Sequence, residues 1–115
     1  MKKALITASG FIFLIIACSK SSSNSTTTVD CSGVAKSYTT EVSPIIQSNC
    51  ATNSGCHAAG SLNGPGELIT YQEIFNARSN IRTAVATGVM PQGSSLSTTQ
   101  RNAILCWIDS GAANN

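Results

Sequence analysis

The sequence has few charged residues. Only 10% of its 115 residues are Asp, Glu, Lys or Arg, and the formal net charge is +2. Lys2 and Lys3 carry that excess, because from residue 18 onward five basic residues balance five acidic ones. Such a chain offers no basic patch for nucleic acid. It also lacks a nucleophile elbow and paired carboxylates, so we do not expect an enzyme.

Histidine and methionine are also scarce, and strand patterns are missing. His57 is the only histidine, and Met90 is the only methionine besides the first residue. No stretch alternates apolar and polar residues long enough to indicate a strand. The sequence therefore predicts an all-α fold with long loops.

Cysteine, in contrast, is abundant, with five residues in a short chain. In a reducing cytosol this number would indicate a metal site, whereas in an exported protein it indicates disulfides or haem thioethers. The N-terminus decides between the two compartments, because it has the layout of an export signal.

The first 17 residues have the pattern of a signal peptide. A positive start, Lys2 and Lys3, precedes an apolar run over residues 4–17 that is short for a membrane-spanning helix. The run ends I-I-A before Cys18, which resembles the lipobox of bacterial lipoproteins. The resemblance implies cleavage before Cys18 and lipid on that residue; the alternative is an ordinary secretory signal. Residues 18–30, rich in Ser and Thr, would form a flexible tether.

Residues 31–115 would form the folded domain, which is small enough to need a covalent or cofactor brace. Ser43 and Pro44 predict a helix start, as N-cap and first helical residue, with the helix ending near Asn49. A longer helix from Thr39, kinked at Pro44, is the alternative. Three further helices are expected over residues 70–78, 81–87 and 98–110, with loops over 60–66 and 89–95. Capping boxes would open the first and last of them, at Thr70 with Glu73 and at Ser97 with Gln100. Ser79 and Asn80 would cap the middle helix, which would end at Gly88.

The stretch C-A-T-N-S-G-C-H, from Cys50 to His57, places two thiols and an imidazole within eight residues. Two cysteines with a histidine directly after the second are typical of covalent haem attachment, in which the histidine becomes an axial iron ligand. Two disulfides among the four cysteines other than Cys18 are the main alternative. Zinc is less favoured, because no second compact ligand pair exists.

The order of three segments resembles the class I cytochrome c-like domains of exported bacterial lipoproteins. The segments are V-S-P-I-I-Q-S-N-C-A-T-N-S-G-C-H-A, L-I-T-Y-Q-E-I and V-M-P-Q-G-S-S-L-S-T-T-Q-R-N-A-I-L-C-W-I-D-S-G-A. The resemblance implies one haem c, attached through Cys50 and Cys56, with His57 as proximal and Met90 as distal ligand. The chain departs from the family in one respect, because five residues rather than two separate the cysteines.

The same resemblance implies a disulfide between Cys31 and Cys106, since the terminal helices of the family pack together. It implies a monomeric electron carrier that is lipid-anchored in the cell envelope, faces the periplasm and exchanges electrons with redox proteins there. The competing expectation is a haem-free, disulfide-stapled helical lipoprotein that acts as a binding or structural module. Arg78 and Arg82 could pair with haem propionates, but a solvated helix face is the simpler interpretation.

Overall fold

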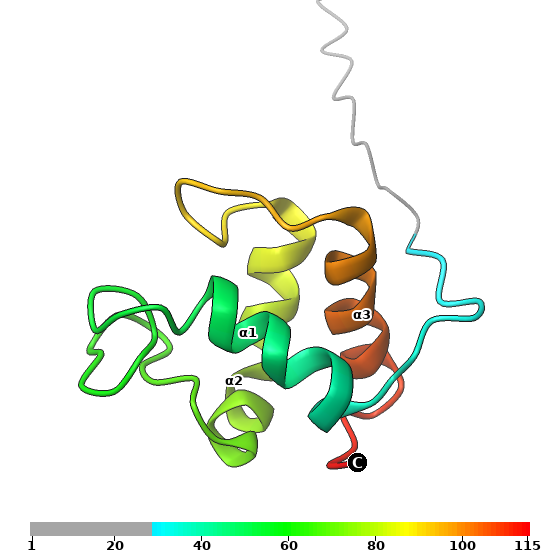
Figure 1. Ribbon diagram of the computed structural model, residues 1–115, viewed down its shortest axis with the longest axis horizontal. Helices are drawn as coiled ribbons and strands as arrows, with labels where there is room; N and C mark the ends of the chain where they lie inside the picture. Colours follow the sequence, from blue (N-terminus) through cyan, green and yellow to red (C-terminus); the bar gives the residue numbers. More distant parts are fainter. Residues whose placement is uncertain (1–28) are drawn as a thin grey trace, which may run out of the picture.

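A computed structural model describes residues 29–115 of the chain. The expected signal peptide, the lipidated Cys18 and most of the tether lie outside the described residues. The described part consists of helices and loops and contains no strand, which confirms the all-α prediction (Figure 1). None of the helices over these residues has the length and apolar character needed to cross a membrane.

The first helical segment begins earlier than Ser43. A π-helical turn, η1 (Tyr38–Val42), leads directly into α1 (Ser43–Asn49), and Ser37 rather than Ser43 is the N-cap. Ser43 has helical dihedral angles, so its expected capping role is wrong and the longer helix is the better description. The wider turn just before Pro44 is a suitable place for a residue that has no N–H and whose ring crowds the preceding turn.

The second helix, α2 (Tyr71–Thr87), is one continuous element where the sequence predicted two. Its start is as expected, because Thr70 and Glu73 form a capping box, and its end is as expected, because Gly88 adopts the left-handed conformation with φ 73°. The predicted break at residues 79–80 is wrong. A single buried stripe runs through the whole helix at helical spacing, and its burial outweighs the local preference of Ser and Asn for caps.

The third helix, α3 (Thr98–Asp109), has the predicted start and ends one residue early. Ser97 and Gln100 form the expected capping box. The buried face includes Trp107, whose side chain is fully enclosed, whereas Ile108 is only partly buried. Trp107 is therefore a central core residue.

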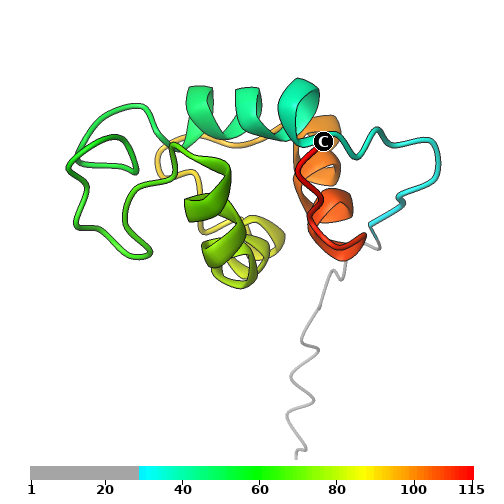
Figure 2. The same ribbon diagram turned by 90° about the horizontal axis from the view of Figure 1, so that it is seen from below.

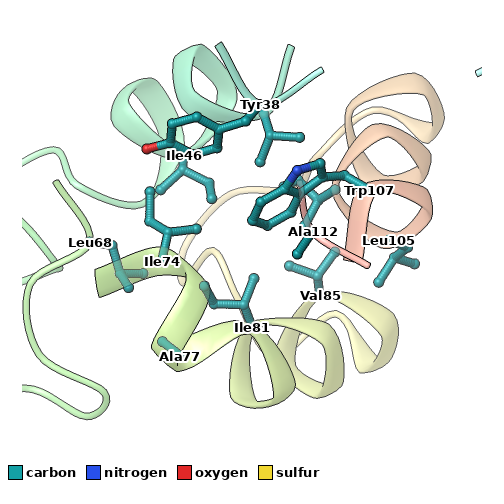
Figure 3. Packing of buried hydrophobic residues seen from close by; sticks show 12 residues of the cluster. Tyr38, Ile46, Leu68, Ile74, Ala77, Ile81, Val85, Leu105, Trp107 and Ala112 are labelled. Atoms are coloured by element: carbon teal, nitrogen blue, oxygen red, sulfur yellow. The ribbon is translucent and has the colours of Figure 1, made fainter. Parts of the chain in front are cut away.

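Three aromatic rings, from η1, α2 and α3, pack against one another in the core. Figure 3 shows two of them, Tyr38 and Trp107, among the buried aliphatic side chains. Tyr38 lies edge-on to Tyr71 at 5.0 Å between ring centroids and 5.7 Å from Trp107. Two of these rings also have hydrogen-bond partners, because Tyr71 donates to the Ala112 carbonyl and Trp107 to that of Ala113, and no fully buried side-chain nitrogen or oxygen of residues 29–115 is unpaired. The rings thus contribute apolar area without leaving buried donors unpaired.

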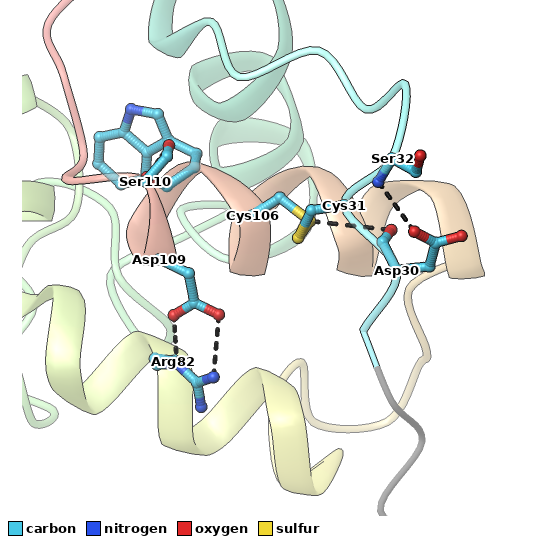
Figure 4. The surroundings of a disulfide bond; sticks show 8 residues. Asp30, Cys31, Ser32, Arg82, Cys106, Asp109 and Ser110 are labelled. Atoms are coloured by element: carbon cyan, nitrogen blue, oxygen red, sulfur yellow. Dashed lines mark hydrogen bonds and ion pairs between the residues drawn. A yellow bond between two sulfur atoms is a disulfide. The ribbon is translucent and has the colours of Figure 1, made fainter.

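Covalent and polar contacts hold both ends of the domain to this core. A disulfide joins Cys31 to Cys106 on α3, the pair that the family resemblance implied (Figure 4). Arg82 on α2 makes a bidentate ion pair with Asp109 on α3, at 2.6 and 3.0 Å. At the C-terminus, Asn115 accepts hydrogen bonds from the segment at the start of η1. α3 is consequently tied to α2, to η1 and to the entering chain.

α1 is less closely packed against α2. The view from below shows α1 extending over α2, with the loop that follows α1 forming one end of the molecule (Figure 2). The close helix contacts are those of α2 with α3 and of α3 with η1. The space between α1 and α2 is where the candidate site lies.

Candidate functional site

A cavity of about 780 Å³ lies between α1, the loop after it, the second half of α2 and the loop after α2. This volume falls within the roughly 300–1,000 Å³ that is typical of pockets for small molecules and cofactors. No Asp, Glu, Lys or Arg is among the residues that line it. The cavity is therefore suited to a largely apolar ligand.

All four residues that the sequence marked as haem ligands or attachment points line this one cavity. Cys50 is the C-cap residue of α1, and Cys56 and His57 follow on the adjoining turn. Met90 comes from the other side, on the loop that follows α2. The fold thus brings together two segments that are far apart in the sequence.

His57 is held firmly, with only 6% of its surface exposed. Its backbone N–H donates to the Cys50 carbonyl at 3.1 Å, and its own carbonyl accepts from Leu68 at 2.9 Å. The ring nitrogen Nδ1 lies 2.8 Å from the Gly66 carbonyl oxygen. A carbonyl can only accept, so Nδ1 carries the proton, and in the neutral ring Nε2 holds the lone pair.

The Nε2 atom of His57 opens into the cavity. Nε2 has no hydrogen-bond partner among the described residues. Every fully buried side-chain nitrogen or oxygen in this part of the chain does have a partner, so Nε2 is not fully buried. The atom is therefore accessible, and the cavity is the space that His57 lines. A histidine whose Nδ1 is fixed by a carbonyl and whose Nε2 is free has the arrangement of a metal-ligating histidine.

The five-residue gap between the cysteines forms an ordered turn. The Asn53 side-chain oxygen accepts from the backbone N–H groups of Gly55 and Cys56, at 2.9 and 3.1 Å. A Cβ on Gly55 would lie 3.0 Å from that oxygen, so the turn favours glycine there. Asn63 closes the turn from outside by donating to the Gly55 carbonyl at 2.6 Å. The additional residues therefore fold into a compact turn that places Cys56 and His57 on the cavity wall.

Cys50 and Cys56 are free thiols, each partly buried. Burial raises the pKa of the Cys50 thiol, and the neighbouring Cys56 thiol raises it further. Both cysteines line the same cavity, and each thiol is available for covalent attachment.

Met90 is fixed relative to the end of α2. Its backbone N–H donates to the Ala84 carbonyl at 3.3 Å, across the left-handed Gly88. The side chain is half-buried and lines the cavity. Thioether sulfur is a soft ligand for iron, so this position is chemically suited to the distal role.

The cavity wall combines the edge of the core with neutral polar groups. Ile46, Leu68, Ile81 and Val85 belong both to the core cluster and to the wall. Asn80 on α2 also lines the cavity, although its residue type and the preceding Ser79 predicted only a helix cap. Asn80 lies four residues before Ala84, another lining residue, so the two share a helix face. This could be recognised only if α2 had been expected to continue through residue 80.

The two arginines of α2 point elsewhere. Arg82 is paired with Asp109, and Arg78 lies over the Phe75 ring at 4.0 Å and donates to the Phe75 carbonyl. Neither arginine lines the cavity, which agrees with the interpretation that they belong to the outer face of the helix. Nor do the aromatic core residues Tyr71, Phe75 or Trp107 reach it.

Within residues 29–115, no three His, Cys, Asp or Glu side chains come together in a way that could hold a bare metal ion. Cys50, Cys56 and His57 therefore do not form a zinc-type cluster. Comparison of the chain with models of protein families, with curated proteins and with solved structures gives no match.

Proposed function

We propose that this protein is a monohaem, cytochrome c-like electron-transfer protein of the cell envelope, anchored by lipid on Cys18 and facing the periplasm. The observation that carries the proposal is the convergence of Cys50, Cys56, His57 and Met90 on one cavity of about 780 Å³. These are the residue types that covalent haem attachment and two-sided iron ligation require. Its partners would be other redox proteins of the envelope.

The residues present fit a haem. Cys50 and Cys56 would hold its vinyl groups as thioethers, and His57 would ligate iron through the free Nε2. Met90 would be the second axial ligand. A single ion without a porphyrin would find no cluster of ligands among the described residues, whereas a porphyrin presents its iron to ligands on two sides.

A haem bound there would supply one-electron chemistry between ferric and ferrous iron. The chain's own contribution is to set the potential and exclude water. The soft Met90 sulfur favours the ferrous state, and the Gly66 carbonyl orients His57. The apolar wall lowers the local dielectric and disfavours the more highly charged ferric state.

A second candidate is a haem-free helical lipoprotein braced by disulfides. The observation that favours it is the position of the aromatic core, which lies outside the cavity and is stapled by Cys31–Cys106. Cys50 and Cys56, both free and both on the cavity wall, would form the second disulfide of this candidate in an oxidising compartment. Such a protein would act as a binding or structural module.

An absorption spectrum and an intact mass separate the two candidates. The protein is produced in cells that express haem-attachment factors and is purified from their envelope. Electron transfer through haem requires a Soret band that shifts on reduction and a mass increased by one haem. A colourless protein with Cys50 and Cys56 joined to each other would contradict the haem proposal and support the module.

The axial role of Met90 has its own test. Met90→Ala should lower the reduction potential and open the iron to cyanide, because a ligand that favours ferrous iron is removed. Leu62→Ala, which truncates an apolar side chain that is 98% exposed and outside the cavity lining, is the matched control and should change neither property. Equal potentials in the parent and in Met90→Ala would show that another group is the distal ligand.

A further inference from the structure

The carbonyl groups at the end of α2 are held by an arginine from another helix. Arg101, in the first turn of α3, donates from Nε to the Val85 carbonyl at 3.4 Å and from Nη2 to the Ala86 carbonyl at 3.1 Å. Carbonyl groups in the last turn of a helix have no partner within the helix and carry its negative dipole end. A guanidinium group donates hydrogen bonds to these carbonyls and also places a positive charge at the negative end of the helix dipole.

Met90 is attached to the same turn. Its N–H donates to the carbonyl of Ala84, the residue just before the two whose carbonyls Arg101 binds. Gly88 donates to the Val85 carbonyl at 3.3 Å, so this oxygen is shared with Arg101. The three consecutive carbonyls therefore link the arginine, the helix end and the departure of the Met90 loop.

Arg101 is free to serve this contact. The ion pair of the described residues is that of Arg82 with Asp109, and it does not involve Arg101. Arg101 is half-buried and does not line the cavity, so it would not touch a ligand there. Its contacts reach the cavity through Val85, which lines it, and through the Met90 loop.

We propose that Arg101 is a positioning residue for Met90: by fixing the last turn of α2 from α3, it fixes the point from which the Met90 loop leaves the helix. The inference rests on the proposed function for the consequence at the iron, but the positioning itself can be measured without haem. Loss of the guanidinium should loosen the turn and let the Met90 sulfur move away from the cavity.

The first measurement is hydrogen exchange of the Met90 amide in the full chain without haem, with Arg101→Gln compared to the parent. We expect exchange to be about tenfold faster, as for loss of one hydrogen bond to a charged group, while the Ile74 amide in the first half of α2 is unchanged. Arg82→Gln is the matched control, because it also removes an arginine contact between α2 and α3. It should leave Met90 exchange as in the parent.

The second measurement uses the haem-loaded protein. Arg101→Gln should weaken the charge-transfer absorption of methionine sulfur with ferric iron and tighten cyanide binding several-fold, whereas Arg82→Gln should do neither. Arg101→Lys keeps the charge at the helix end and should restore part of both properties. It also serves if Arg101→Gln does not fold.

The outcomes distinguish the two proposals. Unchanged Met90 exchange in both Arg101 variants would overturn the positioning role, as would equal acceleration at Met90 and Ile74, which would indicate general destabilisation. A protein that never binds haem, but in which Arg101→Gln selectively accelerates Met90 exchange, would overturn the proposed function and leave the positioning role standing.

Discussion

The Cys31–Cys106 disulfide allows a quantitative test of whether the domain depends on a cofactor. The two cysteines are 75 residues apart in the sequence. In the loop-entropy description, closing a loop of this length stabilises the folded state by about 4.5 kcal/mol. A domain the length of residues 29–115 typically has a total stability of about 4–13 kcal/mol. Replacing both cysteines by serine should therefore remove a large part of the free energy of unfolding.

The assay is urea unfolding of the haem-free chain, followed by circular dichroism. Cys31→Ser with Cys106→Ser should lower the free energy of unfolding by about 2–5 kcal/mol, the usual range for such a bridge in a small exported domain. Cys50→Ser with Cys56→Ser is the matched control, since it replaces the same number of cysteines. These two are free thiols, so the haem-free stability should change far less.

With haem bound, the two double variants should show the opposite order of stability. Because a ligand that binds only the folded state stabilises it, haem should restore folding to the variant without the disulfide. Haem should stabilise the variant without Cys50 and Cys56 less, because that variant cannot form thioethers. The reasoning is refuted if the two double variants lose the same stability without haem, since Cys50 and Cys56 would then form a second disulfide. A loss below about 1 kcal/mol on removing Cys31 and Cys106 would refute the loop-entropy estimate.

Two further predictions concern ionisable groups. Cys56→Ser should lower the pKa of the Cys50 thiol only part of the way to its ordinary value, because burial, the larger cause of the shift, remains. The pH dependence of alkylation in the haem-free protein measures this pKa. An unchanged profile would show that the two thiols are apart. The hydrogen bond from Arg82 lowers the pKa of Asp109, so the pair contributes stability at pH values above about 3.9, the unfolded value, and loses it as the pH falls through the lower folded value. Asp109→Asn should therefore lower the free energy of unfolding by about 0.2–1 kcal/mol at pH 7 and have little effect near pH 2. Urea titrations at both pH values measure this difference. An equal loss of stability at both pH values would indicate a packing effect instead.

Local sequence signals located most of the helix boundaries. The capping boxes at Thr70 and Ser97 and the left-handed Gly88 are formed as predicted, because each depends on hydrogen bonds within a few residues. The errors arose where distant contacts outweighed such signals. Ser79 and Asn80 have cap chemistry but lie inside α2, since the buried stripe that packs on α3 continues past them.

The candidate site likewise combines features that the sequence indicates with features that only the fold reveals. Cys50, Cys56 and His57 were marked by their residue types and order, Met90 was marked by the family resemblance, and all four line one cavity in the structure. The Gly66 carbonyl that fixes His57 could not have been found from the sequence, because every residue has a carbonyl and only the loop geometry selects one. Arg101 was likewise indistinguishable from other surface arginines until α3 was placed beside the end of α2.

The relation between core and cavity bears most directly on function. The aromatic core around Trp107 is complete on the side of α2 that faces α3 and η1, and a disulfide reinforces that side. On the side that faces α1, Ile81 and Val85, which also belong to the core cluster, line a hollow. Protein interiors are otherwise densely packed, and an apolar hollow lacks the dispersion contacts that a filled one would gain. Under the proposed function, a haem between α1 and α2 would supply those contacts, and His57 would ligate its iron through the free Nε2.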